Sequence, residues 1–429
     1  MRTDELSVGV WYVLGRGSGE PSPEHWDANH ISALEEIGPF LNLIICPARN
    51  TSGVTEVMDW CLSNRKISVW SDGLDLEIHE IQSQPVSETE IRKLVRNAWR
   101  KLSPWHSKIS GVVLNLEDYD GSGTPSNPDF RQLYWTGREF ERLYPKLALA
   151  VEGQRWNYPE TNPRSYEEPY DVVFKFPRGV WGHCRYSFYG WGQPGYYDWK
   201  LTWGQVGAFR QAADIVRYRG GAWVNLAQAF ETHHLGLNYQ YPTQEWQDFI
   251  CLNAIAHGAT GINFWPFDTG DSSDYCGLLS SYNSSGATNQ RVIVRNSIEK
   301  AWRLFDQLKG FRLIDYSLNN AYDEVMYEVT EESAIPLNWP IEKIDSGVTS
   351  GDWNQCWDLI EICHWILRAG FEKYTLSNLD PRAGQVKTLQ ISLKESCEWS
   401  IGSQSGYGKT ISDVTIQPGQ VEVLTLRRW

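Results

Sequence analysis

Acidic residues follow several apolar segments of this sequence, and their positions suit the cleavage of a glycosidic bond. The candidate catalytic residues are Glu117, Asp118, Glu152 and Glu231. Cleavage of this kind needs one protonated carboxyl group, which assists the departing oxygen, and one ionised carboxylate on the other side of the bond. The ionised carboxylate either attacks the anomeric carbon or activates a water molecule.

The segment before Glu117 leaves open which of two neighbouring acids would act. In an extended chain every second side chain lies on one face, so Val113, Asn115 and Glu117 share a face. Asp118 then begins the next loop, unless a bulge shifts the register. Glu117 or Asp118 is therefore expected to have a catalytic role.

The partner acid is expected from one of two other segments. Glu231 follows the apolar residues 222–230, and Glu152 closes the apolar residues 147–151. Glu231 is the second catalytic candidate and Glu152 the third. Glu231 can also be interpreted as a rim acid that pairs with a lysine or arginine.

Aromatic residues make up 13% of the chain, which contains 22 tryptophans, and many of these follow apolar segments. An indole offers a flat apolar face and one N–H donor, which suit a sugar ring and its hydroxyl groups. One tryptophan alone is well explained as a core residue, but a set beside acids indicates a carbohydrate site. Residues 177–200 are expected to form an aromatic wall of this site. The predicted substrate-binding residues are Trp11, Trp70, Asp72, Asn115, Arg155, Trp156, Lys175, Trp181, Tyr189, Trp191, Gln228, His233, Trp265 and Asp268.

The elements that must position these residues alternate between short β-type runs and longer amphipathic stretches, which predicts βα units and a parallel sheet. Eight such units fit a (β/α)8 TIM barrel, whose active site lies at the carboxyl ends of its strands. A doubly wound open sheet is the rival fold, but no glycine-rich phosphate turn follows the first strand. Ser87 and Thr243 are predicted helix N-caps, and the last helix of this region is expected over residues 291–308. The expected strands cover residues 7–14, 42–46, 67–70, 109–116, 148–152, 171–176, 222–229 and 261–264.

From about residue 312 the helical periodicity ends and alternating β-type segments replace it. These segments, with turn residues between them, predict a smaller all-β sandwich. We therefore expect a barrel catalytic domain over residues 1–311 and a supporting β-sandwich domain over residues 312–429. The expected strands of the second domain include residues 324–329, 359–362, 386–391 and 421–426.

Charge and composition narrow the possible partners. The formal net charge of -14 argues against nucleic acid and anionic membranes, which attract basic surfaces. No apolar stretch reaches the roughly 20 residues of a membrane span. The eight cysteines form no C-x-x-C pair and no Cys/His metal spacing, so we expect no metal and no cofactor. The location stays open between the cytoplasm and a secreted or periplasmic protein without its signal peptide, and the oligomeric state also stays open.

Two segments carry a resemblance to a known family. Residues 241–246 and 254–265 resemble the "Pro-Thr … Ala-x-x-His-Gly-Ala-x-Gly … aromatic" stretch of barrel glycosidases, and Gln228-Ala229-Phe230 matches the strand before it. In these features and its architecture the chain resembles clan-A-type (β/α)8-barrel glycoside hydrolases with a C-terminal β-sandwich. The resemblance implies that Glu117 is the acid/base and Glu231 the nucleophile. One residue separates Asn115 from Glu117, which leaves Glu117 and Asp118 as alternatives. In the resembling family Gln-Ala-Phe commonly ends in glycine, and a chain in which Glu231 is not the nucleophile would use Asp118 with Glu152.

We therefore expect a glycoside hydrolase that cleaves O-glycosidic bonds of a polysaccharide or oligosaccharide with two carboxylates, with retention as the working hypothesis. Two other classes stay open. A non-catalytic glycan-binding barrel would keep the tryptophans but would not need opposed acids. A barrel lyase or isomerase acting on a sugar phosphate would need a phosphate-binding loop, which does not follow the last strands.

Overall fold

The computed structural model describes most of the chain with gaps between its segments. The described residues are 5–11, 28–46, 52–64, 68–71, 86–115, 130–143, 148–154, 179–184, 199–219, 221–232, 239–267, 276–280, 283–319, 335–347, 359–368 and 370–428.

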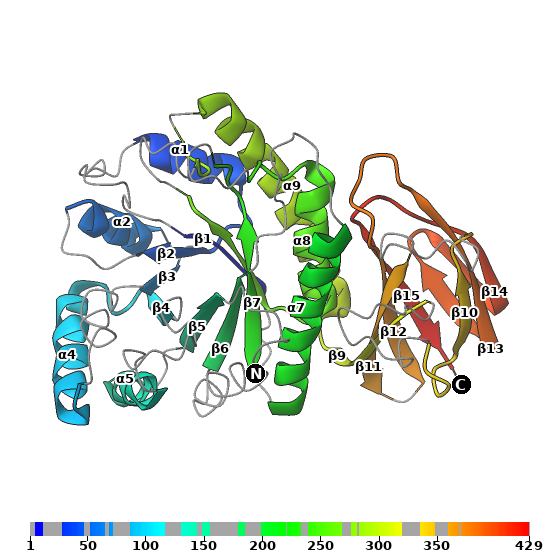
Figure 1. The fold of residues 1–429 in the computed structure, drawn as a ribbon, viewed down its shortest axis with the longest axis horizontal. Helices are drawn as coiled ribbons and strands as arrows, with labels where there is room; N and C mark the ends of the chain where they lie inside the picture. Colours follow the sequence, from blue (N-terminus) through cyan, green and yellow to red (C-terminus); the bar gives the residue numbers. More distant parts are fainter. Residues whose placement is uncertain are drawn as a thin grey trace. The chain divides into compact units, whose positions relative to one another are not determined.

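Eight parallel strands form a closed barrel in chain order, and β1 pairs with β8 to close it (Figure 1). Because every neighbouring pair is parallel, the carboxyl ends of all eight strands meet at one rim. The predicted mixed α/β organisation is therefore confirmed. The strands are β1 (Ser7–Trp11), β2 (Leu43–Cys46), β3 (Ser68–Ser71), β4 (Ile109–Asn115), β5 (Ala148–Gln154), β6 (Gly179–Cys184), β7 (Ala222–Gln228) and β8 (Gly261–Trp265).

Helices follow most of these strands in the sequence, and the predicted N-caps are confirmed. The Ser87 hydroxyl accepts a hydrogen bond from the Glu90 N–H (3.3 Å), and the Thr243 hydroxyl accepts one from the Trp246 N–H (3.4 Å). Each cap satisfies an N–H group that has no partner within the helix. The helices are α1 (Ala28–Ile37), α2 (Ser52–Ser63), α4 (Glu88–Lys101), a 3-10 turn η1 (Ser103–Trp105), α5 (Phe130–Leu143), α7 (Trp199–Arg219), α8 (Gln244–Ala256) and α9 (Ser284–Leu308).

The sixth strand lies elsewhere than its sequence pattern predicts. The expected strand over residues 171–176 falls outside the described residues, and β6 occupies Gly179–Cys184 between β5 and β7. The first of these segments has the stronger β pattern, with two valines and two phenylalanines, whereas β6 contains two glycines. Tertiary pairing to two neighbouring strands therefore decides the position of the strand, and the start of the expected aromatic wall belongs to β6.

Seven further strands form one antiparallel sheet, hydrogen-bonded in the order β10-β13-β15-β12-β11-β9, with β14 paired to β13. Alternate side chains of these strands build an apolar core that includes Ile362, Leu376 and Leu424, all fully buried. The sheet agrees with the predicted all-β character of the C-terminal part. Its strands are β9 (Arg312–Leu318), β10 (Ile341–Asp345), β11 (Ile360–Arg368), β12 (Phe371–Asn378), β13 (Lys387–Ile401), β14 (Gln404–Ile416) and β15 (Val421–Arg427).

The chain divides into two compact units. The first comprises Met1–Tyr186, Asp214–Tyr241 and Ala259–Arg295 and contains all eight barrel strands. The second comprises Ser187–Ala213, Pro242–Gly258 and Asn296–Trp429 and contains α8 and the antiparallel sheet. The domain boundary between residues 311 and 312 is inferred from the change of sequence pattern there, and it stays a prediction.

A buried charge cluster joins three elements of the second unit. From α7, Arg210 donates two hydrogen bonds to the Glu361 carboxylate of β11, from Nε (2.9 Å) and from its terminal nitrogen (2.6 Å). His257, at the end of α8, lies between the same carboxylate (Nε2, 2.9 Å) and the Asn253 carbonyl (Nδ1, 2.8 Å). Both acceptors need an N–H, so this geometry requires the doubly protonated imidazolium.

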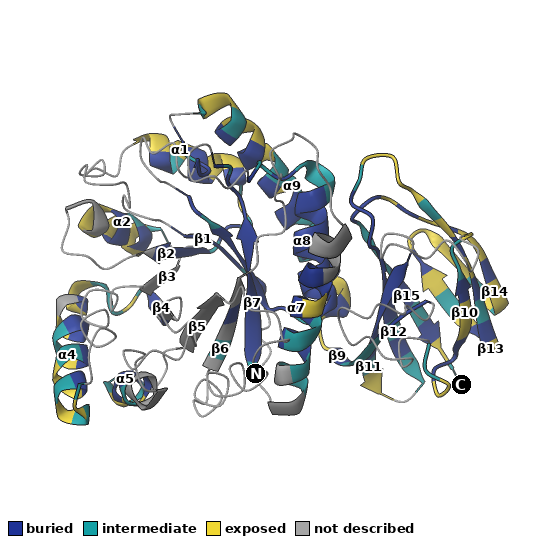
Figure 2. Ribbon diagram, viewed as in Figure 1, coloured by how far each residue is buried: buried dark blue, intermediate teal, exposed yellow. Residues whose placement is uncertain are grey.

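The surroundings of His257 agree with this charge state. Burial alone would lower the pKa of His257, but Cys363 and the Glu361 carboxylate outweigh burial and raise that pKa to about 10. Burial would likewise raise the pKa of Glu361, but Arg210 and His257 hold it below its usual range. The cluster is therefore a set of mutually stabilised charges, and Figure 2 shows the surrounding part of α8 as buried.

Candidate active site

The carboxyl ends of β1, β7 and β8 come together at the rim of the barrel. Gln228 is the register partner of Trp265, and the Ala229 N–H donates to the Trp265 carbonyl (3.2 Å). The Phe267 N–H donates to the carbonyl of Trp11 (2.8 Å), the last residue of β1. Predicted site residues from three strands thus share one rim.

Glu231 lies just beyond β7, where a short bridge fixes its backbone. Its N–H donates to the Cys276 carbonyl (3.2 Å), and its own carbonyl accepts from the Cys276 N–H (2.9 Å). The residue is half-buried, and its carboxylate Oε1 accepts a hydrogen bond from Nδ2 of Asn283. The carboxylate is therefore held at the end of the seventh strand and stays accessible.

Trp265 offers a partly exposed indole beside this carboxylate-bearing segment. The fully buried Phe230 packs edge-on against Trp265, with ring centroids 5.0 Å apart and an interplanar angle of 90°. Tyr239 packs on Phe230 in turn, at 5.3 Å. Trp265 is half-buried, whereas Trp11 is only 7% exposed and belongs to the core. Of these two tryptophans, Trp265 has the surface that a sugar ring would need.

Gln228 supports the loop after β7. Its side chain is fully buried, and its amide Nε2 donates to the carbonyls of Phe230 (3.2 Å) and Gln240 (3.0 Å). These bonds hold both ends of the segment that carries Glu231. A contact between Gln228 and substrate stays a prediction.

Two groups near Glu231, Tyr241 and Cys276, are held in their neutral forms. Burial and, next, the Glu231 carboxylate raise the pKa of Tyr241, whose hydroxyl donates to the Gly277 carbonyl (2.8 Å). Burial chiefly, and Glu231 to a smaller extent, also raise the pKa of the Cys276 thiol. Neither group therefore adds a negative charge beside Glu231 at neutral pH.

Four other predicted residues are placed by their backbones. Asn115 ends β4 and is the register partner of Glu152 on β5, and Glu152 also pairs with Gly182 on β6. Trp70 lies in β3 and Trp181 in β6. The remaining predicted site residues lie outside the described part of the chain: Glu117, Asp118, Asp72, Arg155, Trp156, Lys175, Tyr189, Trp191, His233 and Asp268.

Sequence reasoning missed Asn283 and Cys276 as neighbours of Glu231. A signal for Asn283 exists, because Asn followed by Ser284, Ser285 and a helical stretch is typical of a helix N-cap. The expected helix began at residue 291, whereas α9 begins at Ser284. No local pattern of residues marks Cys276.

Side chains that could hold a metal ion come together at one place among the described residues. They are His257, Glu361 and Cys363, whose ligand atoms lie within 4.8 Å of one another in the second unit. The donors of Arg210 and His257 already occupy the Glu361 oxygens. The buried charge cluster is therefore satisfied by its own hydrogen bonds.

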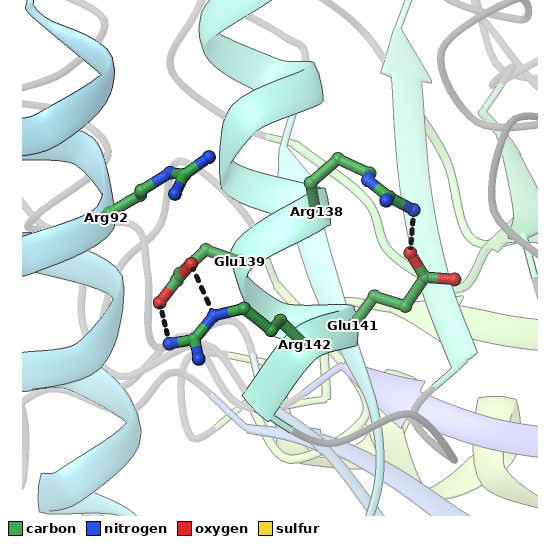
Figure 3. Close-up of a pocket in the computed structure, with 5 residues that line it drawn as sticks. All are labelled: Arg92, Arg138, Glu139, Glu141 and Arg142. Atoms are coloured by element: carbon green, nitrogen blue, oxygen red, sulfur yellow. Dashed lines mark hydrogen bonds and ion pairs between the residues drawn. The ribbon is translucent and has the colours of Figure 1, made fainter.

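A hollow of about 410 Å³ between α4 and α5 has a different chemistry from the barrel rim (Figure 3). The nearly buried Glu139 accepts hydrogen bonds from Arg96 (2.6 Å) and Arg142 (2.6 and 3.0 Å). Hydrogen bonding from Arg142 is the main cause that lowers the pKa of Glu139. Only charged residues line the hollow, so it offers no aromatic ring on which a sugar could stack, and we interpret it as a surface ion-pair cluster.

The fold of this chain is similar to that of glycoside hydrolases from several families. A family 27 β-L-arabinopyranosidase from Geobacillus stearothermophilus, solved with arabinose, has a TM-score of 0.53 and 8% identity, covering 99% of this chain and 98% of that chain. A family 5 glycoside hydrolase from Bacteroides vulgatus has a TM-score of 0.53 and 10% identity, covering 98% and 89%. A β-galactosidase from Bacillus circulans sp. alkalophilus has a TM-score of 0.53 and 9% identity, covering 99% of both chains.

These similar folds confirm the predicted resemblance to barrel glycoside hydrolases. At the level of sequence, no protein-family profile and no curated protein matches the chain. No helix among the described residues is long and apolar enough to cross a membrane.

Proposed function

We propose that this protein is a glycoside hydrolase that cleaves O-glycosidic bonds of a polysaccharide or oligosaccharide at the rim of a (β/α)8 barrel. The observation that carries the proposal is the half-buried Glu231 at the end of β7, next in sequence to Phe230, whose ring packs edge-on against the half-buried Trp265. The fold that this chain shares with glycoside hydrolases supports it. The antiparallel sheet is proposed as a β-sandwich that supports the barrel.

The proposed mechanism uses two carboxyl groups. Glu231 attacks the anomeric carbon as the nucleophile, while Glu117, protonated, gives its proton to the leaving oxygen. Water then displaces Glu231 from the sugar, and Glu117 takes up a proton from that water, so that the configuration is retained. Asp118 is the alternative to Glu117, and Glu152 is the alternative to Glu231.

The proposed substrate site extends from Trp265 over the other strand ends. The residues proposed to line this site are Trp70, Asn115, Trp181, Arg155, Trp156, Asp72, Lys175, Tyr189, Trp191, His233 and Asp268. Aromatic faces would stack on sugar rings while amide, imidazole and charged groups bind the hydroxyls. The binding role of each of these residues is a separate proposal, which substitution of that residue would test.

A panel of polysaccharides and aryl glycosides tests this function. We expect the wild-type protein to release reducing sugar or aryl alcohol from one class of substrate, and Glu117→Gln to lower kcat about 10²–10⁴-fold. Circular dichroism checks that the variant is folded. A protein that binds glycans but releases no product from any of them would instead be a glycan-binding barrel.

A further inference from the structure

We propose that Asn283 is a positioning residue that holds the Glu231 carboxylate with its side-chain amide while its side-chain oxygen caps helix α9. The placement of Glu231 by Asn283 rests on geometry alone. Its consequence for catalysis rests on the proposed function, in which Glu231 reacts with the sugar.

Asn283 has the bonds of an N-cap residue. Its backbone carbonyl accepts from the Ala287 N–H (2.9 Å), which is the first hydrogen bond of α9. Its side-chain Oδ1 accepts from the Gly286 N–H (3.0 Å). The helix end therefore fixes the plane and direction of the Asn283 amide.

The same amide faces Glu231 with its other end. Nδ2 of Asn283 donates to Oε1 of Glu231. The reverse orientation of the amide would set NH2 against the Gly286 N–H and oxygen against the carboxylate, leaving donor against donor and acceptor against acceptor. One orientation thus satisfies both neighbours, and the helix cap aims the donor at the carboxylate.

Gly286 provides the space for this arrangement. A Cβ atom at position 286 would lie 2.5 Å from Nδ2 and 2.8 Å from Cγ of Asn283. These distances are too short for any side chain, so a larger residue at 286 must displace the Asn283 amide. The glycine is required by its close approach to the amide.

The segment that leads to Asn283 is itself fixed to the barrel. Cys276 bridges the backbone of Glu231, and the Leu278 N–H donates to the Pro266 carbonyl (3.2 Å). Arg291 of α9 donates to the Leu278 carbonyl (2.7 Å) and to the Glu36 carboxylate (2.5 Å). The start of α9 is therefore anchored on both sides, and Asn283 keeps its place relative to Glu231.

The Nδ2 donor faces one carboxylate oxygen of Glu231 and so fixes the direction of that oxygen. Aspartate at 283 would still cap α9, because Asp and Asn are comparable N-caps. It would, however, place a second negative charge against Glu231 and disfavour its ionisation. Serine would also cap the helix, but it lacks the amide donor.

The test compares Asn283→Ser, Asn283→Asp and Gly286→Ala, with Ser87→Ala as a matched loss of cap on α4. We expect Asn283→Ser and Gly286→Ala to lower kcat on the order of 10²-fold with little change in KM, as expected for a misplaced reacting group. Asn283→Asp should also move the acid limb of the pH–activity profile to higher pH. Ser87→Ala should lower the melting temperature and leave kcat and the profile unchanged. Gly286→Ala displaces the amide that also caps α9, so the loss of a cap in Ser87→Ala is the control for this effect.

A second readout separates this inference from the proposed function. The chemical shift of the Glu231 carboxyl carbon can be followed by NMR as pH is varied, whether or not the protein is active. Its signal is assigned as the one that is absent from the spectrum of Glu231→Gln. A titration curve that is the same in the wild type and Asn283→Asp would overturn the positioning role, even if Glu231→Gln is inactive. The titration curve of Glu231 could instead move in Asn283→Asp while Glu231→Gln stays fully active. That result would support the contact between Asn283 and Glu231 and contradict the proposed catalytic role of Glu231.

Discussion

At the scale of single residues, the end of β7 combines one accessible carboxylate with groups that stay neutral beside it. Tyr241 and Cys276 are held protonated, and the Asn283 amide donates to Glu231. The carboxylate at the end of β7 is thus held by a neutral amide, whereas Glu139 and Glu141 beside the α4–α5 hollow accept hydrogen bonds from arginines.

The residue patterns predicted Glu231 but not the side chain that holds it. Glu231 follows an apolar strand, and this local signal is visible in sequence. Asn283 lies 52 residues away, and only the closure of the barrel and the course of the 276–283 segment bring the two together. Contacts of this kind have no local pattern, so sequence alone predicts the acid without its partner.

The partly exposed Trp265 leads to a prediction about binding. We expect Trp265→Ala to raise KM several-fold, because a stacked aromatic ring contributes about 0.5–1.5 kcal/mol beyond its buried area. Trp265→Phe should retain part of this contact and show a smaller rise. Initial-rate kinetics at varied substrate concentration measure both effects. An unchanged KM in Trp265→Ala would remove Trp265 from the substrate site.

At the scale of elements, sequence patterns predicted the βα alternation and both helix caps. The sixth strand of the barrel, β6, is a segment with two glycines that pairs with β5 and β7, and the strand expected over residues 171–176 lies outside the described residues. The start of α9 was also predicted too late, because its first residues are serines and a glycine, which are weak helix formers. Local propensity fails at these places, where tertiary contacts decide.

The buried charge cluster of Arg210, His257 and Glu361 gives a prediction about stability. We expect Glu361→Gln to lower the free energy of unfolding by about 3–5 kcal/mol, because it leaves buried cations without their counter-charge. Urea unfolding followed by tryptophan fluorescence measures the change. Glu342→Gln, at an exposed position of β10, is the control and should change stability little. Equal stability of the two variants would contradict the interpretation.

The same cluster predicts how stability depends on pH. The pKa of His257 is raised to about 10 in the folded protein, above the roughly 6.5 of an unfolded histidine. The folded state therefore binds the proton more tightly, and this contribution is complete below about pH 6.5 and is lost as pH rises towards 10. Urea unfolding at several pH values in this window should show wild-type stability falling more steeply than that of His257→Gln. Parallel curves for the two proteins would show that His257 is neutral in the fold.

At the scale of the whole molecule, eight parallel strands bring residues from distant segments to one rim. β1, β7 and β8 contribute Trp11, Gln228 and Trp265, with Glu231 just beyond β7. The alternation of elements made this architecture predictable from sequence, and the glycoside hydrolases with similar folds support it. The buried charge cluster joins residues 104 and 151 positions apart, so sequence did not predict it.

The central claim is that Glu231 is the carboxylate that reacts with a glycoside. The most direct measurement is turnover of an aryl glycoside by the wild type, by Glu231→Gln, and by Glu231→Gly with and without sodium azide. We expect Glu231→Gln to lose at least about 10²-fold in kcat. Azide should restore turnover to Glu231→Gly by occupying the space of the missing carboxylate, and yield a glycosyl azide of inverted configuration. Wild-type turnover by a folded Glu231→Gln would contradict the claim.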